Sequence, residues 1–367
     1  MISDTVKLAF IVILIIGTIS YLEATKSKIV PITAIGPDGG DLLKEMMYKK
    51  APELVGISGY LNTDEKEIKI SDYKGKVVLI DFWTYTCINC IRTLPHLTEW
   101  DRKYRDQGLV IIGVHTPEFA FEKIRENVEN AIHEHNIEYA VVQDNDYATW
   151  RAFQNRFWPH KFLIDKDGFI RYDHIGEGAY EETERQIQLL LSETGAETEG
   201  MNLTGLKDET PRVLLTPELY AGYNFAIPRG QNIGNPGGMK PGQTIKYELP
   251  ATVRKDIIYL KGTWLSNPDD LHAQDSEGAE IVLDFTASKV NIVADSVNGP
   301  LELEVLINDA PATQTQLGSD VQIIGGKAIM TVDRPRLYNV INGEYGNYKL
   351  TLRATNTNFI FSAFTFG

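Results

Sequence analysis

The sequence predicts an α/β domain with a mixed sheet and flanking helices, followed by an all-β domain. Residues 51–194 alternate between strand-like and helix-like patterns, which is typical of α/β folds. Residues 213–367 contain short β-type runs separated by turn residues and no convincing helix. A polar stretch without periodicity, residues 195–212, lies between them and is interpreted as a linker.

Within the first domain, the two most apolar runs predict buried parallel strands at residues 76–82 and 109–114. Helices are expected at residues 87–105, 119–135, 147–154 and 181–191, the second because apolar residues recur there at helical spacing. A short strand is expected at residues 140–142. Runs at 161–165 and 169–172 flank Lys166-Asp167-Gly168, which favours a hairpin that adds antiparallel strands to the sheet.

The second domain is predicted to be a β-sandwich, because its apolar runs are short, regularly separated and rich in β-branched and aromatic residues. The clearest runs are residues 281–285, 290–293, 301–307, 328–330, 350–352 and 359–366.

The N-terminus differs from the rest of the chain. No residue from Leu8 to Leu22 is charged, a length between that of a signal-peptide core and that of a spanning helix. Residues 1–24 are therefore predicted to be a hydrophobic helix that serves as a membrane anchor or signal segment, with residues 25–50 as a tether. Thr18-Ile19-Ser20 is a passable cleavage site, so the chain is expected to be membrane-anchored with its bulk extracytoplasmic, or secreted if the segment is cleaved.

Composition excludes one class of partner. The formal net charge is -14 and 43% of residues are hydrophobic, which indicates a globular protein with an acidic surface. A general nucleic-acid binder needs basic surface to neutralise phosphates, so no nucleic-acid partner is expected.

The two cysteines of the chain, Cys87 and Cys90, lie three positions apart where the strand at 76–82 gives way to a helix. A helix N-terminus favours a thiolate through its free amide groups and the positive end of its dipole. Cys90 would lie one turn deeper, where it can attack a mixed disulfide formed at Cys87. We therefore expect Cys87 to be the nucleophile, Cys90 to be the resolving thiol, and the reversible Cys87–Cys90 disulfide to be the redox group, with no other cofactor.

Two other interpretations of the motif remain open. A metal site would need more than two ligands, and His133 and His135 point to different faces of a helix. A static structural disulfide would normally close a larger loop. No metal site is predicted.

The motif and its surroundings resemble a known family. Asp81-Phe82-Trp83 before the cysteines and Pro95 after them are similar to the thioredoxin active site. Trp158-Pro159 followed by residues 161–165 resembles the cis-proline loop of TlpA-like proteins. Residues 82–90, 97–101, 113–119 and 144–146 are similar to DipZ-type thioredoxin-like proteins, in which a β-sandwich resembling carbohydrate-binding modules, a jelly roll, can follow the redox domain.

The resemblance implies a role for each matched residue. Asp81 would be a buried base with a raised pKa that takes the proton of Cys90. A cis Pro159 would hold the backbone of Trp158 beside Cys87, where an extended protein substrate can pair with it. Trp83 and Trp158 would form an apolar rim against substrate, although either is equally consistent with the core.

The resemblance also implies partners. Protein thiols and disulfides are the expected substrates, and the family favours a reductant or electron relay for envelope proteins. DipZ-type proteins can carry a multi-helix membrane electron-transfer domain, which this sequence lacks. A separate CcdA/DsbD-like membrane protein is therefore the expected electron donor.

Two alternative functions remain. A thiol peroxidase is suggested by Thr84, three residues before Cys87, but the proline of the peroxiredoxin pattern is replaced by Ile80. A carbohydrate-binding or partner-binding module is suggested by the aromatic residues of the second domain, although aromatic residues in strands more often fill the core. The residues that could form an aromatic platform for carbohydrate are Trp264, Tyr220, Tyr223, Tyr259, Tyr338, Tyr345 and Tyr348.

Overall fold

The computed structural model describes residues 44–64, 66–198, 200–275 and 278–367. The chain divides into two compact units, residues 1–49 and 50–367, and both sheets of the protein lie in the second. The predicted N-terminal hydrophobic helix at residues 1–24 lies outside the described residues. Within the described ranges, no helix combines the length and the apolar character that a membrane span requires.

The first sheet has six strands in the order β1-β4-β3-β2-β5-β6. Its central strands β2, β3 and β4 are parallel, whereas β5 runs antiparallel to β2, β6 to β5 and β1 to β4. The mixed sheet that the alternation of strand and helix patterns predicts is therefore confirmed. The strands are β1 (Gly59–Leu61), β2 (Val77–Trp83), β3 (Leu109–His115), β4 (Ala140–Gln143), β5 (His160–Ile164) and β6 (Ile170–Ile175).

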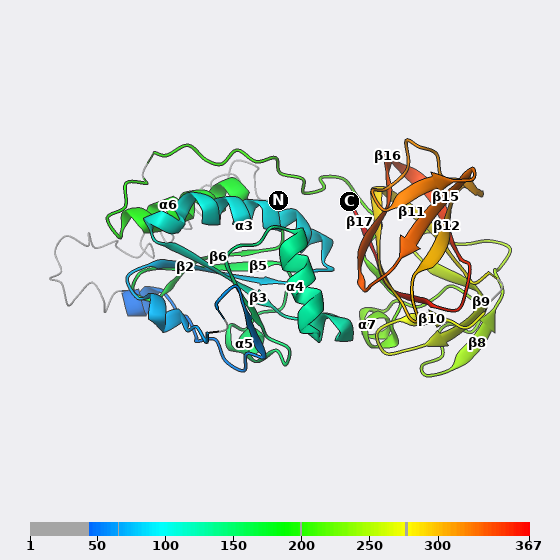
Figure 1. Cartoon of the computed structure of the whole chain (residues 1–367), viewed down its shortest axis with the longest axis horizontal. Coiled ribbons are helices and arrows are strands. Elements are labelled where there is room, and N and C mark those ends of the chain that lie inside the picture. The colour runs from blue at the N-terminus through cyan, green and yellow to red at the C-terminus, as the bar shows by residue number, and fades with distance from the viewer. Residues whose placement is uncertain (1–43, 65, 199, 276–277) are drawn as a thin grey trace, which may run out of the picture. The chain divides into compact units, whose positions relative to one another are not determined.

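Helices cover both faces of this sheet. Figure 1 shows α3 and α6 on one face and the short α5 on the other. Two apolar cores result: Trp83, Trp100 and Leu191 pack together on the first face, and Phe82, Trp150 and Phe162 on the second. The helices are α3 (Ile88–Tyr104), α4 (Arg125–Glu134), α5 (Ala148–Ala152) and α6 (Tyr180–Ser192).

The helix predicted at residues 119–135 is shorter than expected. Residues Ala120–Lys123 form a 3₁₀ turn, Ile124 is extended with φ -75° and ψ 120°, and α4 begins only at Arg125. The buried carboxylate of Glu122 accepts hydrogen bonds from the amides of Glu118 and Phe119, which caps this turn separately. Ile124, at the break, is 52% exposed, so the apolar spacing does not follow one continuous buried helix face.

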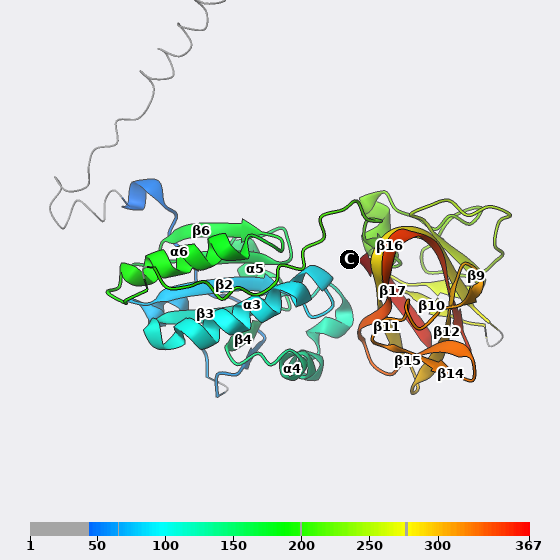
Figure 2. The ribbon, with the colours of Figure 1, turned by 90° about the horizontal axis from the view of Figure 1, so that it is seen from above.

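The C-terminal region is rich in β-strands, as predicted, and forms an eleven-stranded sheet. The strand order is β14-β15-β12-β16-β11-β17-β10-β9-β8, with β13 on β12, β7 on β17 and a further pairing of β11 with β9. Figure 2 shows the long strands β11 and β16 among the yellow to red strands of this region. The β-sandwich, or jelly-roll, arrangement stays a prediction. The elements of the C-terminal region are β7 (Leu219–Tyr220), α7 (Tyr223–Ala226), β8 (Thr244–Tyr247), β9 (Ile258–Ser266), β10 (Leu271–Ala273), β11 (Glu280–Ser296), β12 (Leu301–Ile307), β13 (Ala310–Pro311), β14 (Val321–Ile324), β15 (Lys327–Val332), β16 (Arg336–Ala354) and β17 (Phe359–Phe366).

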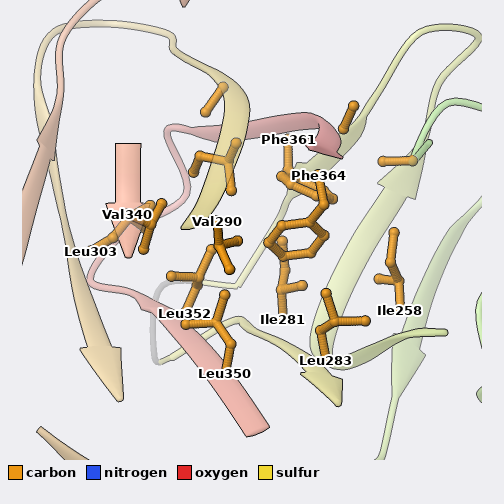
Figure 3. Packing of buried hydrophobic residues seen from close by; sticks show 14 of the residues in the cluster. Ile258, Ile281, Leu283, Val290, Leu303, Val340, Leu350, Leu352, Phe361 and Phe364 are labelled. Atoms are coloured by element: carbon orange, nitrogen blue, oxygen red, sulfur yellow. The ribbon is translucent and has the colours of Figure 1, made fainter. Parts of the chain in front are cut away.

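Two long strands organise this region. The first part of β11 pairs with β9 and its second part with β17, while β16 runs beside it along most of its length. Figure 3 shows part of the resulting core, where Ile281 of β11, Leu352 of β16 and Phe361 of β17 pack together. The one-turn helix α7 was not expected from the sequence.

The aromatic platform proposed for carbohydrate is wrong in its central residue. Trp264 is 0% exposed, and its indole Nε1 donates a hydrogen bond to the carbonyl oxygen of Lys261 at 2.9 Å. Tyr259 and Tyr338 are also buried in the core. A ring without exposed surface cannot stack on a sugar, so Trp264 belongs to the packing of the β region.

We expect Trp264→Ala to destabilise the chain by about 3–5 kcal/mol, because it removes a large side chain from a closed core. Urea unfolding followed by fluorescence and circular dichroism measures this effect. Tyr345→Ala is the matched control, since Tyr345 is 49% exposed, and it should cost less than about 1 kcal/mol. Equal, small losses in both variants would contradict the assignment of Trp264 to the core.

Candidate active site

The dithiol lies where β2 ends and α3 begins. Cys87 is the N-cap of α3, and its Sγ accepts a hydrogen bond from the backbone amide of Cys90 at 3.3 Å. Cys87 is partly exposed, whereas Cys90 is 1% exposed, and both are free thiols. An N-cap side chain that accepts from the first turn satisfies a free helix amide, and it places the sulfur at the positive end of the helix dipole.

Burial separates the two thiols chemically. The pKa of the Cys90 thiol is raised well above its ordinary value by burial, and its hydrogen bond and charge interactions with Cys87 and Asp81 raise it further. Cys90 therefore stays protonated until a base removes its proton. The solvent-facing sulfur is Cys87, as the spacing predicted.

Asp81 lies on β2 beneath the dithiol, with 1% of its surface exposed. Among the described residues, neither of its carboxylate oxygens has a hydrogen-bond partner. Burial raises the pKa of Asp81 to about 7, and the positive charge of Lys161 opposes part of that rise. A carboxyl group that exchanges its proton near neutral pH is suited to act as a general base.

Lys161 is a site residue that the sequence analysis did not assign. It faces Asp81 directly across the antiparallel pairing of β2 and β5 and is 1% exposed. Its Nζ donates a hydrogen bond to the carbonyl oxygen of Gly176 at 3.0 Å. Burial lowers the pKa of Lys161, while Asp81 and Cys90 raise it. The sequence signal was a lysine between His160 and the apolar run Phe162-Leu163-Ile164 of β5.

The Trp158–Pro159 peptide bond is cis, as the resemblance implied. Strand β5 begins at His160, which pairs with Phe82 near the end of β2, so Trp158 is brought to the dithiol end of the sheet. The Trp158 indole Nε1 donates a hydrogen bond to the carbonyl oxygen of Thr116 at 3.1 Å. Trp158 and Cys87 line the same pocket.

Trp83 does not lie on a rim. It is 0% exposed, and its ring packs edge-on against His115 with centroids 5.2 Å apart. Every residue of β2 is buried, so both faces of this strand are covered. The expectation that Trp83 faces substrate is wrong, and the core interpretation holds.

Thr84, the residue that suggested a peroxidase, is also buried. Its exposure is 0%, and its Oγ1 lies 3.4 Å from Nε2 of His115. The segment that carries Glu122 is tied to the dithiol loop by Thr86, whose hydroxyl donates a hydrogen bond to the carboxylate of Glu122.

In the described part of the chain, no group of three or more His, Cys, Asp or Glu side chains is arranged to hold a metal ion.

Comparison with known proteins gives matches over both regions. Residues 47–173 match the family described as AhpC/TSA family, and residues 216–367 match the family described as Thioredoxin like C-terminal domain. Protein DipZ of Mycobacterium tuberculosis is 40% identical over 266 residues, which cover 72% of this chain and 37% of that protein. The chain thus spans little more than a third of these mycobacterial relatives.

Two shorter relatives match the α/β region. Thiol-disulfide oxidoreductase YkuV of Bacillus subtilis is 31% identical over 144 residues, which cover 39% of this chain and 95% of that protein. Thiol-disulfide oxidoreductase ResA of Bacillus cereus is 29% identical over 148 residues, covering 40% of this chain and 80% of that protein. The mixed sheet, the dithiol at the helix start and the alignment that covers 95% of YkuV agree: the chain belongs to the thioredoxin-like thiol-disulfide oxidoreductases.

Proposed function

We propose that this protein exchanges disulfides with protein substrates through the Cys87–Cys90 dithiol. The observation that carries the proposal is the contrast between the two sulfurs. Cys87 is partly exposed, and its Sγ accepts a hydrogen bond from the backbone amide of Cys90. Cys90 itself is buried one turn deeper in the helix. An accessible nucleophile followed by a protected resolving thiol is the arrangement that thiol-disulfide exchange requires.

In the reductive direction, the Cys87 thiolate attacks a substrate disulfide. A Cys87–substrate disulfide forms, the substrate S–S bond breaks, and one substrate sulfur leaves. Asp81 then takes the proton of Cys90, and the Cys90 sulfur attacks Sγ of Cys87. The Cys87–Cys90 disulfide forms, the second substrate sulfur leaves, and two electrons have passed from the dithiol to the substrate.

Trp158 and Pro159 are proposed to receive the substrate backbone. The loop that carries them leads directly into β5, which pairs with the strand preceding Cys87. An extended peptide can add to such a loop by backbone hydrogen bonds, with its cysteine directed into the pocket that Trp158 shares with Cys87.

We also propose that the chain works outside the cytoplasm as a reductant or relay, with a separate CcdA/DsbD-like membrane protein returning two electrons to the Cys87–Cys90 disulfide. The uncharged segment from Leu8 to Leu22 supports this location, and so does the confinement of both cysteines to one motif. A membrane-impermeant maleimide applied to intact cells tests it: labelling of Cys87 only after lysis would contradict an extracytoplasmic position.

A thiol peroxidase is the second candidate, favoured by the match of residues 47–173 to the AhpC/TSA family. Peroxide binding would need the Thr84 hydroxyl beside Cys87, but Thr84 is fully buried and lies against His115. Disulfide exchange is therefore the better-supported chemistry. Peroxide consumption at catalytic rates, measured with the reduced chain, would reverse this preference.

Cys90→Ser is expected to trap substrates. Without the resolving sulfur, the Cys87–substrate disulfide has no internal thiol to release it, so covalent complexes accumulate. Non-reducing gels and mass spectrometry of the purified variant measure them. The Cys87→Ser/Cys90→Ser chain is the control and should capture nothing; equal capture by both variants would contradict the relay.

A further inference from the structure

The pocket that contains Cys87 is built from both regions of the second unit. Its volume is about 180 Å³, and its walls include Cys87, Glu118 and Trp158 from the α/β region and Glu218, Tyr220 and Phe366 from the β region. A substrate sulfur bonded to Cys87 would lie in this space. The polar side chains Glu118, Glu218 and Tyr220 line the same space.

Two carboxyl groups in this pocket compete for one hydroxyl. The Tyr220 hydroxyl oxygen lies 2.7 Å from Oε1 of Glu118 and 2.9 Å from Oε2 of Glu218. A phenol has a single proton to donate. Both contacts are hydrogen bonds only when one carboxyl group is itself protonated and donates to Tyr220. The geometry thus implies a proton held by the Glu118–Glu218 pair.

The surroundings favour retention of this proton. Burial and the neighbouring carboxylate raise the pKa of Glu118, whose side chain is 8% exposed. The pKa of Glu218 is also raised by burial of its carboxyl group, although the residue as a whole is exposed at the surface. Glu122 adds a further negative charge behind Glu118. The opposing charge is Arg229, whose Nη2 lies 4.0 Å from Oε1 of Glu118 and whose guanidinium carbon lies 4.3 Å from the Tyr220 ring centre.

Glu118 is held in place from its own region. Its backbone amide donates to the carboxylate of Glu122, which also accepts from Thr86, the residue immediately before Cys87. A single buried group therefore fixes both the segment that carries Glu118 and the loop that carries Cys87.

We propose that the Glu118–Glu218 pair, bridged by Tyr220, is the proton donor to the substrate sulfur that leaves when Cys87 attacks. This inference rests on the proposed disulfide exchange. As the Cys87–substrate bond forms and the substrate S–S bond breaks, the departing thiolate takes the proton from the pair and leaves as a neutral thiol. Solvent that reaches Glu218 returns a proton to the pair before the next substrate sulfur leaves.

The two proton transfers of the reaction, from Cys90 and to the leaving substrate sulfur, are then made by separate groups. Asp81 accepts a proton from Cys90 on the buried side of the dithiol, and the Glu118–Glu218 pair donates one on the substrate side. Proton donation accelerates departure most when the leaving thiol is weakly acidic, because a weakly acidic thiol makes a poor leaving thiolate.

Two small disulfides with different leaving groups test the proposal. The reduced full chain is mixed in a stopped-flow instrument with a dialkyl disulfide, whose thiol is weakly acidic, or with a diaryl disulfide, whose thiol is strongly acidic. For Glu118→Gln/Glu218→Gln at neutral pH, we expect the dialkyl rate to fall by about 100-fold and the diaryl rate to stay within about threefold. Glu126→Gln, an exposed carboxylate on α4, is the control and should change neither rate.

A second measurement needs no variant. In the unaltered chain, the dialkyl-to-diaryl rate ratio should fall as the pH rises and the pair loses its proton. Equal loss of both rates in the double variant together with a pH-independent ratio in the unaltered chain would reduce the pair to a structural role and overturn the proposal. Failure of the unaltered chain to reduce either compound would instead contradict the proposed function itself.

Discussion

Cys87→Ser is expected to abolish disulfide exchange by the full chain, leaving only the uncatalysed background. Cys90 cannot replace the lost nucleophile, because its side chain is 1% exposed and burial raises its pKa well above the ordinary value. Reduction of insulin disulfides by the reduced chain, followed by turbidity, measures the effect.

The matched control is Cys90→Ser, which keeps the accessible sulfur. That variant should form a mixed disulfide once per molecule and then stop, whereas Cys87→Ser should form none. If Cys87→Ser retains exchange and Cys90→Ser does not react, the assignment of nucleophile and resolving thiol is reversed.

Asp81→Asn is expected to slow the attack of Cys90 on the mixed disulfide by about 100-fold or more, because the variant lacks the base that removes the Cys90 proton. In the unaltered chain this step should become slower as pH falls below about 7, where the Asp81 carboxylate becomes protonated. The variant should lack that inflection. Quenched-flow alkylation of mixed-disulfide intermediates separates this step from the first attack.

The same substitution should stabilise the fold. The pKa of Asp81 is raised from 3.8 to about 7 in the folded chain, so folding is favoured at low pH and that contribution is lost as the pH rises towards 7. Linkage gives about 4 kcal/mol for the full cost of ionising this group above pH 7. Lys161 loses its carboxylate neighbour in the variant, so the measured gain should fall below this value.

Urea unfolding at pH 5 and pH 8 measures the gain, which should be larger at pH 8. Asp106→Asn, an exposed carboxylate beyond the C-terminal end of α3, is the control and should shift neither midpoint appreciably. A destabilised Asp81→Asn chain with an unchanged rate of Cys90 attack would contradict the role of Asp81 as a buried base.

Local patterns predicted the parts of the site that depend on local structure. The apolar runs placed β2 and β3, and the cysteine spacing placed Cys87 at a helix start, since both signals act over a few residues. The same signals failed for Trp83. Because both faces of β2 are buried, alternation along the strand does not tell which side chains reach solvent.

Contacts across long separations were beyond sequence reasoning. Lys161 faces Asp81 only because β5 pairs antiparallel with β2 in one register. Glu118 and Glu218 meet through Tyr220 although no local pattern connects them. The sequence predicted β11 as two fragments, residues 281–285 and 290–293, and only residues 350–352 of β16, because polar residues interrupt the apolar runs of both strands.

The central claim is that Cys87 and Cys90 form one reversible two-electron couple. The most direct measurement equilibrates the full chain in dithiothreitol buffers of graded redox poise, quenches with acid, and counts maleimide labels by mass spectrometry. The account predicts two populations, with no labels or with two, that interconvert in a single transition. A chain that carries one label across the series, or two labels under every oxidising condition, would contradict it.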